Sequence, residues 1–325
     1  MSQPQLAIVV DTEEEFDWTK PFDRSSRATS SIPGQALAHR VYDEFGAVPT
    51  YVIDYPVATD PNAIAFLGAL KRDGKAEIGA HLHPWVCPPY DEVVTTRHSY
   101  QCNLPPALER AKMAALTEAI TAAFGDRPKV FKAGRYGFGP NTQQVLIDLQ
   151  YEIDTSYVPH VSFESDSGPN YYNTPDQPFW LDEGAQLLEV PLTSGFIGGL
   201  ARLGGHIAPL FDSARGRQFR LPGALAKSGL VARSRLTPEG VSAEEQCALL
   251  SSMVAQGRDV FVLTYHSPSL AVGHTPYVRT QADLDAFVAR IAAVLRFFRD
   301  ELGGRFTTLT QLRAERLLPQ VHATP

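Results

Sequence analysis

Residues 76–85, AEIGAHLHPW, decide how we interpret the rest of the chain. The first five residues are typical of a short buried strand, and two histidines, His81 and His83, stand where that strand ends. Neutral imidazoles are good ligands for Zn²⁺ and similar ions. We expect the two to share one ion only if the backbone leaves strand geometry after His81, which Pro84 favours. Because isolated histidine pairs more often make ordinary hydrogen bonds, the interpretation depends on the other strand ends.

Composition narrows the class of protein. The chain has 325 residues, of which 44% are hydrophobic and 20% charged, as expected for a globular protein with a large core. Its net charge of -7 argues against nucleic acid as a partner. No apolar run approaches the roughly 20 residues that span a bilayer. The beginning of the chain, MSQPQLAIVVDTEEEF, lacks the basic region of a signal peptide, so we expect a cytoplasmic protein. Assembly into a homo-oligomer is compatible with this sequence.

Apolar runs alternate with segments of helical spacing along most of the chain. The predicted strands are 6–10, 48–53, 76–80, 129–133, 151–153, 187–192, 260–265 and 305–308. Such alternation predicts an α/β protein whose parallel sheet is covered by helices, either open or closed into a barrel. The first strand is not followed by GxGxxG, which removes the main support for a dinucleotide-binding fold.

Polar side chains recur at the ends of the predicted strands. They are Asp11, Glu13, His81, His83, Arg135, Asp154, Thr193 and His266. In a barrel of parallel strands the chemistry takes place at the carboxyl ends, which meet on one rim. A single polar strand end is usually a cap or a turn, but six strand ends with acids, histidines and an arginine predict a functional site.

Five short motifs stand in a fixed order: VVDTEEEFDW, EIGAHLHPW, AGRYGFGP, IDTSY and LTYH. In this order the sequence resembles the polysaccharide deacetylase family (NodB homology, carbohydrate esterase family 4). The resemblance runs from residue 6 to about residue 310. The stretches DTEEEFDW and YHSPSL are similar to one deacetylase-like subgroup of that family.

The resemblance implies a distorted (β/α)7-type barrel, with residues 1–325 forming one domain that carries long rim loops. It also implies that Glu13, His81 and His83 bind one divalent metal ion, with Zn²⁺ first and Co²⁺, Fe²⁺, Mn²⁺ or Ni²⁺ as alternatives. Trp85 occupies the position of the family's second histidine, so His98 is a reserve candidate for the ligand set.

The same resemblance assigns catalytic roles. Asp11 would be the base that accepts a proton from water, and His266 the acid that protonates the leaving group. Arg135 would keep Asp11 ionised and Asp154 would keep His266 protonated, since charged neighbours shift a pKa in these directions. The Tyr136 backbone N–H would help to bind the oxyanion.

Residues 199–238 interrupt the alternation and are strongly basic. Between residues 201 and 236 there are seven lysines and arginines but a single acidic residue, Asp212, which gives a local net charge of +6. We expect a basic insertion at about 199–238 that faces an anionic partner, either a phosphate-bearing substrate or a neighbouring subunit.

The sequence therefore predicts a metal-dependent carbohydrate deacetylase, a hydrolase that acts on amide bonds and also on esters, with an acetylated carbohydrate as substrate. One alternative is a related C–N hydrolase that acts on a small non-sugar amide, which rests on an analogy between folds. Another is a non-catalytic protein for glycan binding or assembly on the same barrel. Metal content separates the last alternative from the first two.

Overall fold

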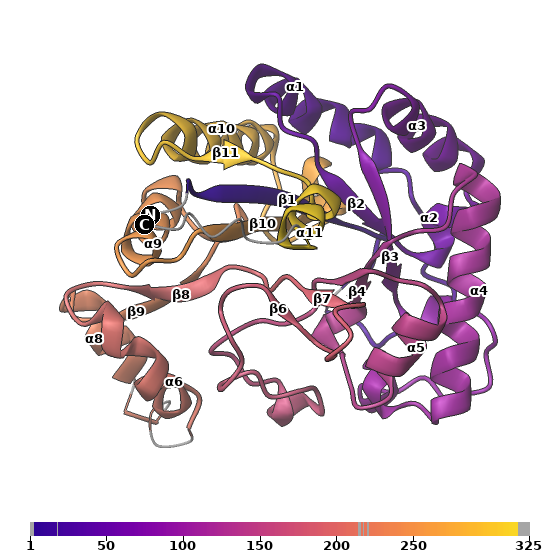
Figure 1. Ribbon diagram of the computed structural model, residues 1–325, viewed down its shortest axis with the longest axis horizontal. Coiled ribbons are helices and arrows are strands. Elements are labelled where there is room, and N and C mark those ends of the chain that lie inside the picture. Colours follow the sequence, from indigo (N-terminus) through magenta and orange to yellow (C-terminus); the bar gives the residue numbers. More distant parts are fainter. Residues whose placement is uncertain (1–2, 18, 214–215, 217, 220, 318–325) are drawn as a thin grey trace, which may run out of the picture.

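A curled sheet of mostly parallel strands, wrapped by helices, forms the body of the protein (Figure 1). The computed structural model describes residues 3–17, 19–213, 216, 218–219 and 221–317. The strands of the sheet are β1 (Gln5–Thr12), β2 (Thr50–Ile53), β3 (Glu77–Leu82), β4 (Val130–Ala133), β5 (Ile153–Asp154), β6 (Phe179–Trp180), β7 (Leu188–Glu189), β10 (Val260–His266) and β11 (Arg305–Phe306). The helices are α1 (Gln35–Phe45), α2 (Tyr55–Thr59), α3 (Pro61–Arg72), α4 (Pro106–Phe124), α5 (Thr142–Asp148), α6 (Gly204–Asp212), α8 (Leu221–Lys227), α9 (Ala243–Val254), α10 (Gln281–Asp300) and α11 (Leu309–Leu317). Within the described ranges, no helix has both the length and the hydropathy of a membrane span.

The strand order is β10-β1-β2-β3-β4-β5-β7-β6, and β11 pairs with the start of β1. Every pair in this sheet is parallel except that of β6 with β7. Parallel neighbours need crossover connections, which the helices supply. The predicted α/β barrel-type fold is confirmed, although pairing between the described strands leaves the sheet open between its two end strands, β6 and β10.

Side chains alternate between the two faces of each strand. On β1, Val10 packs in the core beneath the helices, whereas Val9 packs in the smaller core inside the barrel. Asp11 has the same phase as Val9, and on β10 His266 has the same phase as Val262, which is also inside. The alternation therefore carries both polar side chains to the inner mouth of the barrel.

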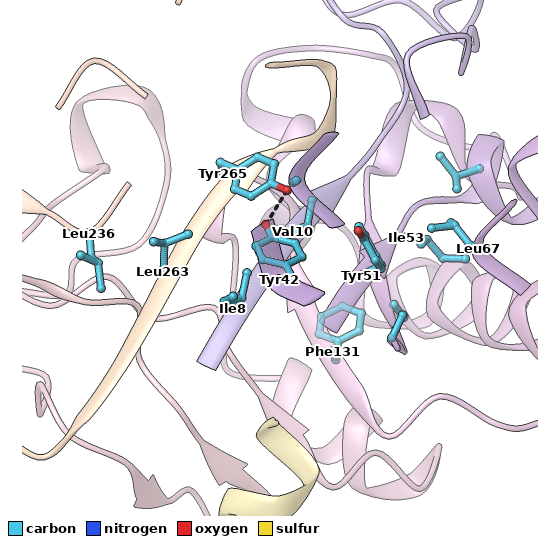
Figure 2. Close-up of a cluster of buried hydrophobic side chains, with 14 of the residues drawn as sticks. Ile8, Val10, Tyr42, Tyr51, Ile53, Leu67, Phe131, Leu236, Leu263 and Tyr265 are labelled. Carbon is cyan, nitrogen blue, oxygen red and sulfur yellow. Dashed lines mark hydrogen bonds between the residues drawn. The ribbon is translucent and has the colours of Figure 1, made fainter. Parts of the chain in front are cut away.

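The core between sheet and helices is rich in aromatic side chains (Figure 2). The hydroxyls of Tyr42 from α1 and Tyr265 from β10 are buried and hydrogen-bond to each other at 2.8 Å. Tyr265 also donates to Gln35 Oε1 at 3.0 Å. A buried hydroxyl without a partner is costly, so these bonds allow the aromatic rings to fill the core between α1 and the sheet.

Thr193, which follows β7, and Leu236, which follows β9, form hydrogen bonds at the open edge of β10. Thr193 accepts the Val262 N–H on its hydroxyl at 2.8 Å and the Leu236 N–H on its carbonyl at 3.0 Å. The Leu236 carbonyl in turn accepts the Thr264 N–H at 3.1 Å. These bonds provide acceptors for the backbone N–H groups of Val262 and Thr264, which pair with no strand on this side of β10.

The described part of the basic stretch, together with the residues just before it, forms a lobe beside the barrel (Figure 1). Its antiparallel ribbon of β8 (Ser194–Ile197) and β9 (Ala232–Arg235) packs with α6 on a small apolar core. Arg233 binds both carboxylate oxygens of Asp212, at 2.7 and 2.9 Å. Three basic residues of the stretch, Arg215, Arg217 and Arg220, lie outside the described residues.

Replacing Thr193 by Val should destabilise the protein by about 1–3 kcal/mol, because the buried Val262 N–H would lose its acceptor. Urea unfolding measures the change in the free energy of unfolding. Thr193→Ser keeps the hydroxyl and is the matched control, so it should retain most of the stability. A loss in Thr193→Ser with none in Thr193→Val would mean that methyl packing, not this hydrogen bond, matters.

Candidate active site

The carboxyl ends of β1, β3 and β10 open into a cavity of about 320 Å³. The residues predicted from sequence that line it are Asp11, Glu13, His81, His83, Arg135, Tyr136, Thr193 and His266. Asp11 is the direct neighbour of His266 in the parallel register of β1 and β10. Glu13 meets His81 in β3 and His83 just after it, although β2 lies between β1 and β3. These strand ends therefore meet at one cavity, which Asp154 does not line.

Glu13, His81 and His83 bring three ligand atoms together. Glu13 Oε2 lies 3.6 Å from His81 Nε2 and 3.4 Å from His83 Nε2. The backbone of His83 stays extended, with φ -98° and ψ 105°. Side chains two residues apart on an extended strand share one face, so the expectation that the backbone must leave strand geometry is wrong. Ordinary strand geometry itself places the two imidazoles side by side.

Hydrogen bonds to Nδ1 set the tautomers of both histidines. His81 Nδ1 lies 3.1 Å from the Lys132 carbonyl, which can only accept, so this nitrogen carries the proton. His83 Nδ1 donates to Glu14 Oε2 at 2.8 Å, and Trp85 donates to the other Glu14 oxygen at 2.8 Å. Both Nε2 lone pairs are therefore directed toward Glu13, the usual arrangement of metal-binding imidazoles.

Glu14 belongs to a second acidic cluster behind His83, with Asp54 as its neighbour. Burial raises the pKa of Glu14 to about 7 and that of Asp54 well above its usual value. Asp54 accepts the Glu14 N–H at 2.7 Å and caps α2 through the Val57 N–H at 2.9 Å. Because both Glu14 oxygens already accept hydrogen bonds, this cluster orients His83 rather than competing for an ion. The sequence pattern predicted no role for Glu14 beyond that of one residue in an acidic turn.

The Glu13 cluster fits a divalent metal ion. Glu13 Oε2 is buried and has no hydrogen-bond partner in the described part of the chain, which is costly for a carboxylate oxygen. Its three candidate ligand atoms all lie within 4.8 Å of one another. Two imidazoles and one carboxylate suit Zn²⁺. The reserve candidate His98 is not part of this cluster, because its Nδ1 bonds to the Val93 carbonyl at 2.9 Å in a separate turn.

Asp11 is paired with Lys132 of β4. Lys132 Nζ donates to the two Asp11 oxygens at 2.6 and 2.7 Å, and both side chains are buried. Burial alone would raise the pKa of Asp11, but the charges of Lys132 and the nearby histidines outweigh it and hold the pKa below its usual value. The prediction that Arg135 pairs with Asp11 is wrong. The lysine three residues earlier reaches across the barrel to do so.

Arg135 and Tyr136 form a strained turn at the rim of the cavity. Their φ angles of 53° and 61° lie in the left-handed region, which costs roughly 1–2 kcal/mol for each non-glycine residue. Arg135 pairs with Asp166, and its guanidinium lies 4.1 Å from the centre of the Tyr100 ring. The Tyr136 ring lies over Lys132 Nζ at 5.6 Å. Strain of this kind concentrates at functional sites.

His266 is oriented by Glu239, which follows β9. His266 Nδ1 donates to Glu239 Oε2 at 2.8 Å, and the His266 backbone N–H donates to Oε1 at 3.0 Å. Its Nε2 lies 3.7 Å from Asp11 Oδ2. Burial by itself would lower the pKa of His266, but Glu239 first, then Glu13 and Asp11, raise it to about 10. The imidazole is therefore protonated at neutral pH. Sequence reasoning missed Glu239, which lies in a loop that matches no motif.

Asp154, the predicted partner of His266, lies elsewhere, so that prediction is wrong. It is buried beside Glu189, its direct neighbour in the register of β5 and β7, and accepts the Ser156 hydroxyl at 2.8 Å. Burial raises the pKa of Asp154 to about 6 and that of Glu189 well above its usual value. At neutral pH the two carboxyl groups share a proton, and they join the two strands rather than act on a substrate.

Glu189→Gln should increase the free energy of unfolding more at pH 8 than at pH 5. Because the folded pKa of Glu189 exceeds its unfolded value, this group contributes stability at low pH that is lost as pH rises toward the folded pKa. Glutamine stays neutral and removes that loss. Urea unfolding across this pH range measures the effect, with the exposed Glu183→Gln as the charge-matched control. Parallel curves for wild type and Glu189→Gln would contradict it.

No family model matches this chain, and no curated protein matches it. Solved structures do. A protein designated a polysaccharide deacetylase from Pseudomonas aeruginosa PAO1 has a TM-score of 0.54 at 15% identity, covering 97% of this chain and 92% of that one. Another so designated, from Mycobacterium smegmatis, has a TM-score of 0.52 at 17% identity, covering 100% and 96%. PuuE allantoinase has a TM-score of 0.52 at 15% identity, covering 95% and 89%. The chain therefore shares its fold with structures designated polysaccharide deacetylases and with this allantoinase.

Proposed function

We propose that this protein is a metal-dependent hydrolase that removes an acetyl group from an acetylated sugar or glycan precursor. One observation carries the proposal. An unsatisfied, buried Glu13 oxygen faces two imidazole nitrogens in the same cavity as an ionised Asp11 and a protonated His266. Amide hydrolysis needs these parts together: an electrophilic centre, a base for the water and an acid for the leaving amine.

Glu13, His81 and His83 would hold one divalent ion, with Zn²⁺ as the first choice and Co²⁺, Fe²⁺, Mn²⁺ or Ni²⁺ as alternatives. When bound, such an ion lowers the pKa of water to about 7 and polarises a carbonyl oxygen. Three protein ligands leave a position open, as in catalytic rather than structural zinc sites. Glu14 acts behind them as a positioning residue, because its bond to His83 Nδ1 orients the ring.

Asp11 is the general base in this proposal. Its carboxylate is ionised at neutral pH and lines the cavity, so it can accept a proton from the attacking water. Lys132 is a positioning residue, because its two bonds to Asp11 hold the carboxylate in place. The ion pair also keeps Asp11 charged in a buried position.

His266 is the general acid. Its imidazolium lies within 3.7 Å of Asp11 and faces the same cavity, so it can protonate the nitrogen of the leaving amine. Glu239 is its positioning residue, since it accepts both the Nδ1 proton and the backbone N–H of His266. The proton that Asp11 accepts from water balances the proton that His266 supplies to the amine.

The remaining predicted residues take smaller parts. The Tyr136 N–H would help to stabilise the oxyanion, supported by the position of Tyr136 at the end of β4 and in the cavity wall. Arg135, held by Asp166, would contact substrate at the rim. We assign Asp154 no direct catalytic role.

We also propose that the protein acts in the cytoplasm, on a soluble glycan or a nucleotide- or lipid-linked sugar. Its three cysteines, Cys87, Cys102 and Cys247, are all free thiols. Widely spaced free thiols suit a reducing compartment.

A second candidate function is hydrolysis of a small cyclic amide. Its support is the shared fold with PuuE allantoinase, together with a cavity of about 320 Å³, near the lower end of the roughly 300–1,000 Å³ of ligand pockets. Release of acetate from N-acetylated and O-acetylated sugars, compared with opening of small cyclic amides, separates the two. A protein that binds no metal after chelator-free purification, and hydrolyses neither class, would instead support a non-catalytic glycan-binding role.

Asp11→Asn and Glu13→Ala should fail in different ways. Losing the base should reduce acetate release by roughly 10²–10⁴-fold while metal content stays nearly intact. Losing the ligand should reduce both metal content, measured by elemental analysis, and rate. An Asp11→Asn protein that loses its metal, and regains full rate at high metal concentration, would reverse the two assignments.

Glu239→Gln should move the alkaline limb of the pH–activity profile to lower pH by about one unit or more. Glu239 is the carboxylate that most raises the pKa of His266 toward about 10, so without it the imidazole loses its proton at lower pH. Glu244→Gln, an exposed position on α9, is the control with the same change of charge. An unmoved limb in Glu239→Gln would mean that His266 does not supply the leaving group's proton.

A further inference from the structure

Arg235, the last residue of β9, reaches the cavity from the basic lobe. It is exposed and lines the cavity together with Asp11, Glu13 and His266. Tyr136 and Tyr277 line the same cavity. Burial raises the pKa of both phenols, and the positive charge of Arg235 opposes that rise. Of the basic residues between positions 201 and 236 that the structure describes, this one stands in the wall of the proposed active site.

The other cations at the cavity are each matched by a carboxylate. Lys132 is paired with Asp11, Arg135 with Asp166, and His266 with Glu239. The Arg235 side chain, unlike its backbone, forms no ion pair or hydrogen bond with any residue in the described part of the chain. The cavity therefore presents one guanidinium whose charge the described residues leave uncompensated.

Glu239 is the acid nearest to Arg235 in sequence, but its oxygens are already in use. Oε1 accepts the His266 N–H at 3.0 Å and the Ser269 hydroxyl at 2.6 Å, and Oε2 accepts His266 Nδ1 at 2.8 Å. Both Glu239 oxygens thus hold His266, the proposed general acid, and an ion pair with Arg235 would weaken these bonds. Two residues before Arg235, Arg233 is different, because it is neutralised by Asp212.

We propose that Arg235 binds an anionic group of the substrate, a carboxylate or a phosphate carried by the acetylated sugar. This inference rests on the proposed function and adds the substrate class to it. The planar guanidinium matches both anions with two parallel hydrogen bonds. Recognition at the wall would leave the acetyl group free to reach Asp11 and His266 in the same cavity. The preferred substrates are therefore acidic acetylated sugars rather than neutral ones.

The test compares three ligands: the methyl glycosides of N-acetylglucosamine and of N-acetylglucosaminuronic acid, and N-acetylglucosamine 6-phosphate. The wild-type protein should show a lower KM for at least one acidic sugar than for the neutral one, and the two acidic ligands distinguish carboxylate from phosphate recognition. Arg235→Gln should raise KM for the preferred acidic sugar by about 10- to 100-fold with a smaller change in kcat, since a hydrogen bond to a charged group contributes this much. Arg235→Lys should restore part of the loss, because it keeps the charge without the fork.

Arg202→Gln is the matched control, because Arg202 is an exposed arginine of the same lobe that lines a different cavity. It should preserve the preference for the acidic sugar. Equal KM values for acidic and neutral sugars in the wild type, or an Arg235→Gln effect no larger than that of Arg202→Gln, would overturn the inference.

Calorimetric binding of the same three ligands separates this inference from the proposed function. Tighter binding of an acidic sugar by wild type than by Arg235→Gln, without any acetate release, would keep the anion site and refute the deacetylase. Acetate release from all three sugars, without any preference in binding or KM, would keep the deacetylase and refute the anion site.

Discussion

The buried ion pair between Asp11 and Lys132 is the interaction on which the whole site depends. It spans the interior of the barrel, from β1 to β4, and both side chains are almost completely buried. Removing one partner of such a pair leaves an uncompensated charge in the interior, which typically costs about 3–5 kcal/mol. Lys132 also has a second task, because its carbonyl accepts the Nδ1 proton of His81. One residue of β4 thus orients the proposed base through its side chain and a candidate metal ligand through its backbone.

The same arrangement recurs around the cavity, where partners from other segments also hold two of the histidines. Glu14 orients His83, and Glu239 orients His266. Close packing between β4 and the strand that carries the histidines also keeps these groups in place. Residue 134 lies in this contact and has no room for a side chain. A Cβ there would lie 2.2 Å from the Leu82 carbonyl oxygen and 2.6 Å from the His83 ring. The end of β4 can therefore press against the histidine strand only because residue 134 is glycine.

The members of the candidate site could be predicted from the sequence better than their partners. Asp11, Glu13 and His266 stand at the ends of apolar runs, and parallel strands bring such ends to one rim. The partners obey no comparable rule. Lys132 is inside a strand, where sequence patterns predict that a lysine is on the surface. Arg135, three residues later, was predicted to be the cation that pairs with Asp11. Only the curvature of the sheet, which turns β4 toward β1, decides between them.

The sequence by itself determined the alternation of strands and helices and the set of polar residues at the strand ends, because hydrophobic periodicity and strand termination are local properties. The tertiary structure alone decided which charges meet. Asp154 pairs with Glu189 and not with His266, while a loop residue, Glu239, holds His266 instead. Coulombic and hydrogen-bonding partners must lie within a few ångströms. That separation depends on strand register and on how far the sheet curls, neither of which any short stretch of sequence contains.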